Sequence, residues 1–241
     1  MRLAPPFRAQ GDHIAVDLPG ARALFTTRRG GVSEGPYASL NLGLWTEDES
    51  ERVHANRRRV ADLAGGRLAQ GRQVHGAGVR RVAESGEVGE IAPADGQATA
   101  LQGVAPTVLV ADCLPIALAA PGVAAMLHAG WRGLAAGIVE EGVAAVCQLA
   151  GGAPAAAAIG PGAGGCCYEV GEDVHAALGG EGRRGRNLDL KAIARARLEA
   201  AGVPEVHDVG LCTICGDPEL FFSHRRDGGV TGRQAGVVWR T

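Results

Sequence analysis

The chain has 241 residues, and its 24 Lys and Arg residues nearly balance its 26 Asp and Glu residues, giving a formal net charge of −2. This balance provides no global attraction to nucleic acid or to an anionic membrane surface, so both classes of partner are disfavoured. No segment approaches the roughly 20 apolar residues that a spanning helix needs, and the N-terminal segment lacks the apolar stretch of a signal peptide. We therefore expect a cytoplasmic protein with one domain over residues 1–241, long enough to bury a substantial core.

The first third of the chain predicts short strands and one helix. Strands are expected at residues 14–17 and 23–27, before a turn-rich segment. A helix is expected after Asp48 and ends at the adjacent glycines 65–66. Its buried face is predicted to carry Val53, Val60, Leu63 and Ala64. Two further short strands are expected around His75.

Two apolar runs in the middle of the chain predict buried strands that end in polar residues. Cys113 follows the run at residues 108–111, and His128 follows the run at residues 123–127. An apolar hairpin core needs neither side chain. Fixed side chains at strand ends can face a cleft, so both residues are candidates for a functional site.

The rest of the chain mixes helices and strands without a regular alternation. The expected elements are a helix at residues 133–150, a strand before a glycine loop at 160–165, a helix from Asn187 or Asp189 to about residue 201, and strands within 205–211, 220–224 and 235–239. This order favours the α+β class, with mixed β-sheets packed between helices, over a doubly wound parallel sheet.

The glycine run at residues 160–165 formally matches G-x-G-x-x-G. A dinucleotide site requires a long helix directly after this motif, with its N-terminus toward the pyrophosphate. Here Cys166–Gly171 follows, with a glycine after one turn, so a Rossmann site is disfavoured. A tight turn that favours anions remains open.

The six cysteines are predicted to be free thiols unless one binds a metal. They are Cys113, Cys147, Cys166, Cys167, Cys212 and Cys215. Cys212 and Cys215 form a C-x-x-C motif, but a four-cysteine zinc site requires a second such motif, and the sequence has none. A thioredoxin-like role is disfavoured because Gly216-Asp217-Pro218 interrupts any helix at once. We therefore interpret the motif as two core or loop thiols.

His75, Cys113 and His128 are the candidate metal ligands. Their spacing matches no short-range zinc motif, so from spacing alone each can equally be a turn histidine, a buried cysteine or a strand-end histidine. Their chemistry is compatible with a site in which two imidazoles and one thiolate hold zinc and leave the fourth position open. Asp112 is placed to orient one of these ligands.

Arginines occur in adjacent groups, of which two lie in turn-rich loops. The groups are Arg28-Arg29, Arg57-Arg58-Arg59, Arg183-Arg184 and Arg225-Arg226. Most such pairs are solvated. Because guanidinium is the natural bidentate ligand of phosphate and carboxylate, the two loop pairs, which include Arg28 and Arg225, are also candidates for anion binding.

Several longer motifs, in order along the chain, resemble the landmarks of the YfiH-type laccase-domain family. They read TTRRGGVSEGPYASLNLG, QVHG, ADGQAT, ADCLPIAL, HAGWRG, IGPGAGGCCYEVG, NLDLKAIARARLEAAGV and FFSHRRDGGVTGRQA. The similarity extends from about Ala23 to Trp239. The members of this family were long labelled polyphenol oxidases and later recognised as zinc-dependent purine nucleoside phosphorylases.

The resemblance implies a function and a set of site residues. It implies zinc on His75, Cys113 and His128, and phosphorolysis of adenosine, inosine, guanosine and methylthioadenosine to base and ribose 1-phosphate, with accompanying deamination of adenosine. Purine nucleosides and phosphate are then the partners. From loop position alone, we expect Arg28 or Arg225 to neutralise anionic oxygens and Asn41 to bind ribose or base. The preferred nucleoside, the proton-transfer residue and the oligomeric state are not predicted.

Two other functions remain as alternatives. A metal-free cysteine hydrolase or deamidase would use Cys113 as nucleophile and His128 as base, but would leave His75 without a role. A copper polyphenol oxidase would need a multinuclear copper cluster, and the seven histidines of the chain are scattered singly. Copper is therefore a less favoured metal than zinc.

Overall fold

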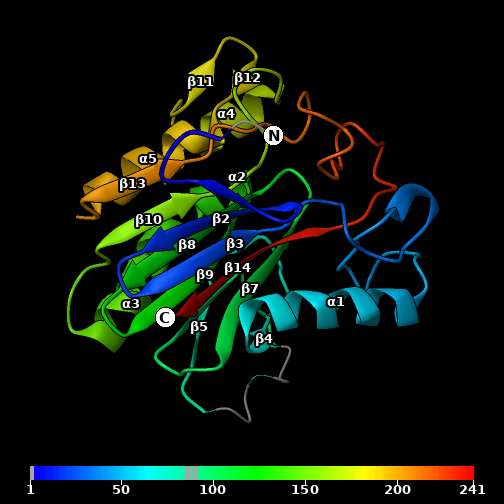
Figure 1. The fold of residues 1–241 in the computed structure, drawn as a ribbon. Helices are drawn as coiled ribbons and strands as arrows, with labels where there is room; N and C mark the ends of the chain where they lie inside the picture. Colours follow the sequence, from blue (N-terminus) through cyan, green and yellow to red (C-terminus); the bar gives the residue numbers. More distant parts are fainter. Residues whose placement is uncertain (1–2, 85–87, 89–91) are drawn as a thin grey trace.

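Two six-stranded β-sheets packed face to face form the centre of the computed structural model, which describes residues 3–84, 88 and 92–241 (Figure 1). In spatial order, the first sheet holds β1 (Arg8–Gln10), β2 (His13–Leu18), β3 (Ala21–Phe25), β14 (Gln234–Arg240), β7 (Val104–Val110) and β4 (Arg67–Ala69). The second holds β13 (Glu205–Asp208), β10 (Ala156–Ile159), β8 (Leu114–Ala120), β9 (Val123–Ala129), β6 (Gly96–Thr99) and β5 (Val79–Val82). The β4–β7, β5–β6 and β10–β13 pairs are parallel and the other pairs antiparallel, so both sheets are mixed.

Helices cover the outer faces of both sheets. Helix α1 (Ser50–Ala64) packs on the first sheet, whereas α2 (Trp131–Ala135), α3 (Ile138–Ala150) and α5 (Leu190–Ala200) pack on the second. A short helix α4 (Glu172–Ala177), a 3₁₀ turn (Gly35–Tyr37) and a small hairpin of β11 (Arg183–Arg184) and β12 (Asn187–Leu188) complete the described elements. The expected α+β class, with mixed sheets between helices, is confirmed.

The side-chain alternation of β8 and β9 explains how the layers are held together. Leu118 and Leu127 belong to the core beneath the helices, whereas Ala117 and Met126 belong to the core between the sheets. Since strand side chains alternate between faces, His128 lies on the same inter-sheet face as Met126. Strand β9 therefore places His128 at one end of the gap between the sheets.

Most predicted elements are present, and the differences have local causes. The strand expected at residues 220–224 is absent because the Gln234 side chain accepts from the Phe222 N–H at 2.7 Å and donates to its carbonyl at 3.2 Å, which takes these groups out of any ladder. The helix expected at residues 133–150 is split, since Gly137 has φ of 90° between α2 and α3. Leu63, expected on the buried face of α1, is 41% exposed. No helix in the described part of the chain is long and apolar enough to cross a membrane.

Candidate metal centre

Three side chains from separate segments meet at one end of the inter-sheet gap. Cys113 lies in the turn between β7 and β8, His128 lies on β9, and His75 lies in the loop between β4 and β5. Their ligand atoms all lie within 4.8 Å of one another. The two imidazole rings meet edge to face, with centroids 4.9 Å apart. The structure therefore brings together the three residues that were singled out as metal ligands.

Asp95, a residue that sequence reasoning missed, positions two of the three side chains. Its buried carboxylate accepts hydrogen bonds from the backbone N–H groups of Val74, His75 and Gly76 at 3.1, 2.9 and 2.8 Å. It also lies 2.8 Å from Nδ1 of His128. A carboxylate on one ring nitrogen fixes the tautomer and turns the other nitrogen toward the metal position. The only signal for this role was the position of Asp95 in the ADGQAT motif.

Asp112 holds the turn next to Cys113 and does not contact the imidazoles directly. Its Oδ1 accepts from the Thr213 hydroxyl at 2.6 Å, and its Oδ2 accepts from the Arg225 N–H at 2.8 Å. Asp112 and His75 have φ of 93° and 60°, and among the described residues they are the two non-glycine residues with left-handed φ. Such strained conformations cluster at functional sites, because only the surrounding contacts can maintain them.

The electrostatics of the centre favour an ionised thiol. Burial raises the pKa of Cys113, but His128 and His75 lower it more strongly, to about 6. Burial likewise lowers the pKa of His128, while Cys113 and Asp95 raise it to about 9. In the absence of metal, the pair is therefore held as thiolate and imidazolium, and a divalent cation would take the place of the proton between them.

The donor set is suitable for zinc. Imidazole nitrogen and thiolate sulfur are both zinc ligands, and a catalytic zinc site has three protein ligands, which leaves one tetrahedral position for water or substrate. The backbone is fitted closely around the thiol, because a Cβ at Gly130 would lie 2.7 Å from Sγ of Cys113. Glycine at this position lets the turn after β9 approach the cluster.

The cluster borders a cavity of about 430 Å³, a size typical of small-molecule sites. The cavity is lined by backbone and side chains of Gly43, Leu44, Trp45, Thr46, Arg57, Gln70, Gln73, His75, Leu109, Ala111, Asp112, Cys113, His128, Gly130, Trp131, Arg132, Tyr168, His224, Arg225 and Arg233. Its wall combines aromatic surface with four guanidinium groups, so it is suited to an aromatic ligand that also carries negative charge.

None of these four guanidinium groups forms an ion pair with a carboxylate among the residues that the structure describes. They belong to Arg57, Arg132, Arg225 and Arg233. Burial lowers the pKa of Arg57 to about 10, and burial also lowers the pKa of Arg233. Desolvated cations without a carboxylate partner favour an incoming anion.

Of the three residues expected to bind substrate, only Arg225 lines the cavity. Its guanidinium lies 5.1 Å from the centre of the Tyr168 ring and donates to the Glu169 carbonyl at 2.7 Å. Arg28 lies elsewhere, stacked 4.6 Å over Phe222 and donating to the Ala38 and Pro218 carbonyls. The Arg28 donors thus hold loops together, outside the lining of this cavity.

Asn41, expected to bind ribose or base, is fully buried and does not line the cavity. Its amide donates to Thr46 and Asp48, each at 2.9 Å. Its Oδ1 accepts from the N–H groups of Gly43 and Arg233. Asn41 therefore shapes the loop that forms one wall of the cavity and fixes the backbone at Arg233.

Comparison with known proteins agrees with this architecture. Residues 22–241 match the family described as multi-copper polyphenol oxidoreductase laccase. A purine nucleoside phosphorylase of Corynebacterium glutamicum is 40% identical over 240 residues, which cover 90% of this chain and 94% of that protein. The chain belongs to the YfiH-type laccase-domain family.

Two solved members of the YfiH-type family share the whole fold. The crystal structure of YlmD from Geobacillus stearothermophilus has a TM-score of 0.89 at 37% identity and covers 97% of this chain and 98% of its own. That of a YfiH protein from Bacillus licheniformis has a TM-score of 0.89 at 31% identity, with 99% and 100% covered. The double sheet and its flanking helices are therefore a property of the family.

Proposed function

We propose that the protein is a zinc-dependent purine nucleoside phosphorylase that converts adenosine, inosine, guanosine and methylthioadenosine, with phosphate, to base and ribose 1-phosphate. The observation that carries the proposal is the placement of His75, Cys113 and His128 on the wall of a cavity with four guanidinium groups that have no carboxylate partner among the described residues. The purine nucleoside phosphorylase of Corynebacterium glutamicum, 40% identical to this chain, supports the same reaction class.

The arginines supply the phosphate site in this proposal. Phosphorolysis requires phosphate to be held against C1′ of the ribose while the glycosidic bond stretches. Arg225 and Arg233 lie in the cavity with Asp112 and Cys113, and their planar donors match the phosphate oxygens. Desolvation of Arg233 strengthens this attraction, because the low local dielectric weakens the competition from water.

The aromatic wall supplies the base site. Tyr168 and Trp131 line the cavity beside the cluster, and Trp45 is 69% exposed at its edge. Burial raises the pKa of Tyr168 to about 12, so its hydroxyl stays protonated and can donate a hydrogen bond to the ligand. A purine packed on such a wall gains apolar contact and stacking.

Zinc on the three ligands would polarise a phosphate oxygen or activate water, and the second possibility also accounts for the proposed deamination of adenosine. The protein's own part is to hold that position. Asp95 orients His128, and the His128 and His75 side chains keep Cys113 ionised.

The test is chromatography of adenosine incubated with purified, zinc-loaded protein, with and without phosphate. The proposal predicts adenine and ribose 1-phosphate only when phosphate is present, and inosine under both conditions. Formation of inosine without adenine would indicate a deaminase and contradict phosphorolysis. Intact adenosine under every condition would contradict the nucleoside function altogether.

A metal-free cysteine hydrolase is the second candidate, favoured by the thiolate–imidazolium pair of Cys113 and His128. It leaves His75, within 4.8 Å of both, without a chemical role. Metal content separates the two candidates: a hydrolase keeps activity after chelation and loses it on alkylation of Cys113. Copper oxidase chemistry is less favoured, because His75 and His128 are the only histidines in the metal-ligand clusters of the described residues.

A further inference from the structure

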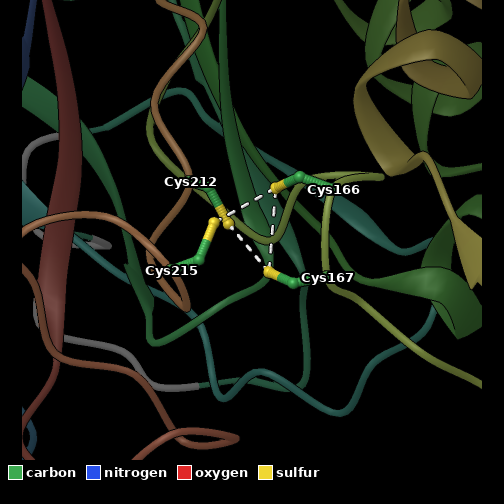
Figure 2. A group of neighbouring side chains, drawn as sticks. All are labelled: Cys166, Cys167, Cys212 and Cys215. Carbon is green, nitrogen blue, oxygen red and sulfur yellow. Dashed lines mark hydrogen bonds between the residues drawn. The ribbon is translucent and has the colours of Figure 1, made fainter.

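Four cysteines from two loops far apart in the sequence gather into a second cluster, so the C-x-x-C motif, interpreted above as two core or loop thiols, has further thiols beside it. Cys212 and Cys215 lie in the loop after β13, and the adjacent pair Cys166-Cys167 lies in the loop after β10. Figure 2 shows the four sulfur atoms pointing toward one another from the two sides. The second pair that a four-cysteine site requires is therefore present, as C-C and not as C-x-x-C.

The spacing of the sulfur atoms matches a single tetrahedral ion. Sγ of Cys166 lies 3.7 Å from that of Cys167 and 3.3 Å from that of Cys215, and Sγ of Cys167 lies 3.5 Å from that of Cys212. All four sulfurs lie within 4.8 Å of one another. With zinc–sulfur bonds of about 2.3 Å, the sulfurs of a tetrahedral site are about 3.8 Å apart. The three measured separations are slightly shorter than this value, so small adjustments of the side chains complete the geometry.

The surroundings supply the positive charge and hydrogen bonds that four thiolates need. The Gly164 N–H donates to Sγ of Cys212 at 3.3 Å, and the N–H groups of Ile214 and Cys215 also hydrogen-bond to it. The buried Lys191 ammonium interacts electrostatically with Cys212 and Cys166. Such donors around the ligand atoms are typical of metal sites, where they orient the thiolates.

We propose that Cys166, Cys167, Cys212 and Cys215 bind one structural zinc ion, separate from the site at His75, Cys113 and His128. Four thiolates in a tetrahedral arrangement favour zinc, and a closed set of four protein ligands leaves no open position for chemistry. Binding releases the thiol protons and forms four zinc–sulfur bonds with no change of oxidation state. The proposal does not depend on the nucleoside reaction.

The ion would join the two loops that form one wall of the cavity. Tyr168 directly follows Cys167. On the other side, the loop of Cys212 and Cys215 is hydrogen-bonded to the Arg225-Arg226 segment, because Arg226 donates to the Thr213 carbonyl at 2.8 Å. Asp112 bonds to both Thr213 and Arg225. The structural ion thus stabilises the position of Tyr168 relative to Arg225 across the cavity wall.

The first test is the zinc content per chain, measured by inductively coupled plasma mass spectrometry. The protein is purified without chelator from zinc-supplemented cultures. The Cys212→Ser/Cys215→Ser variant is expected to lose one zinc per chain relative to the wild type. The matched control is Cys147→Ser on α3, a half-buried thiol outside both clusters, which should keep the wild-type content. Equal zinc in the double variant and the wild type, with unchanged circular dichroism, would overturn the proposal.

A second measurement keeps the proposal testable if the serine variant fails to fold. Cobalt is added to a His75→Ala/His128→Ala variant, which lacks the other site but retains all four cysteines. Sulfur-to-cobalt charge-transfer absorption and the visible bands of tetrahedral cobalt are expected. Their absence, or disulfides at these cysteines in freshly isolated wild-type protein alkylated without reductant, would overturn it.

Discussion

Asp95 is the residue on which the geometry of the metal centre depends most. One carboxylate holds three consecutive N–H groups of the His75 loop and Nδ1 of His128. Burial alone would raise the pKa of Asp95, but His128 and the N–H donors of Gly76 and Val74 bring it below its ordinary value. The group is therefore ionised near neutral pH, and two candidate metal ligands share a single anchor.

Replacing Asp95 with Asn tests this role. The amide retains one oxygen acceptor but loses the charge and presents an NH₂ group to neighbours that are also donors. Loss of such a supporting carboxylate typically costs about 10–100-fold in metal affinity. Competition with a zinc-binding dye should show this weakening at the His75, Cys113 and His128 site. Unchanged affinity, with unchanged circular dichroism, would show that Asp95 does not position the ligands.

Arg225 tests the anion site. Arg225→Ala removes a guanidinium from the cavity, and a hydrogen bond to a charged group contributes roughly 1.5–3 kcal/mol, which corresponds to about 10–100-fold. Steady-state kinetics should therefore show a higher KM for phosphate with a smaller change in the KM for nucleoside. Arg186→Ala is the control, since Arg186 is exposed, lies outside the cavity lining and pairs with Glu169. Equal effects of the two substitutions would argue against phosphate at Arg225.

At the scale of elements, the position of the site depends on how closely the two sheets approach. Gly236 on β14 faces the second sheet, where an added Cβ would lie 2.5 Å from Cβ of Pro115 and 2.9 Å from Sδ of Met126. Pro115 pairs with His128 in the β8–β9 register. The glycine therefore sets the separation of the sheets directly beneath the metal centre.

Gly236→Ala should destabilise the fold through this contact. Overpacking of a well-packed core typically costs about 1–3 kcal/mol. Urea denaturation is expected to give a lower free energy of unfolding by this amount, while Gly152→Ala, at an exposed position with nothing within 4 Å of the added Cβ, should have little effect. An unchanged free energy of unfolding in the Gly236→Ala variant would mean that the sheets can separate at low energetic cost.

The sequence predicted elements whose signal is local. Apolar runs ending in polar residues identified the strands that carry Cys113 and His128, and the glycines after residue 64 marked the end of α1, where Gly65 has φ of 62°. Two features were not predictable. The split between α2 and α3 depends on the φ of Gly137, and the missing strand at 220–224 depends on hydrogen bonds from the Gln234 side chain on another segment. Spacing did not identify His75 as a ligand; the chemistry of the donor set made it a candidate, and the resemblance to the family implied zinc there.

Other parts of the site were missed for the same physical reason. Asn41 was expected to bind substrate because of its loop position, but both polar atoms of its side chain bond within the protein. The cysteine cluster joins residues about 50 positions apart, and the adjacent pair Cys166-Cys167 does not have the spacing of a zinc motif. Contacts between distant loops leave no periodic signal in one sequence.

At the scale of the whole molecule, the fold buries a titratable group far from the metal centre. His13 on β2 is 7% exposed, and its Nδ1 accepts from the Thr27 N–H at 3.3 Å. Burial lowers its pKa below the ordinary value of 6.5, and Asp12 only partly offsets this. The unfolded chain therefore binds this proton more readily than the folded chain, so stability falls as pH drops below about 6.5.

His13→Asn should remove this contribution to the pH dependence. The amide oxygen can accept from the Thr27 N–H but does not titrate. The loss of unfolding free energy between pH 7.5 and pH 5.5, measured by urea denaturation at both values, should therefore be smaller in the variant than in the wild type. An identical loss in the two proteins would place the acid sensitivity elsewhere.

In the proposed function, metal on His75, Cys113 and His128 supports phosphorolysis in the adjoining cavity. The most direct measurement is the rate of adenine release from adenosine and phosphate by native, chelated and zinc-reloaded protein, each alongside a Cys113→Ala variant. We predict that chelation abolishes phosphate-dependent release, that zinc restores it, and that the variant stays inactive after zinc addition. Full activity of the chelated protein, with metal removal verified, would contradict the account.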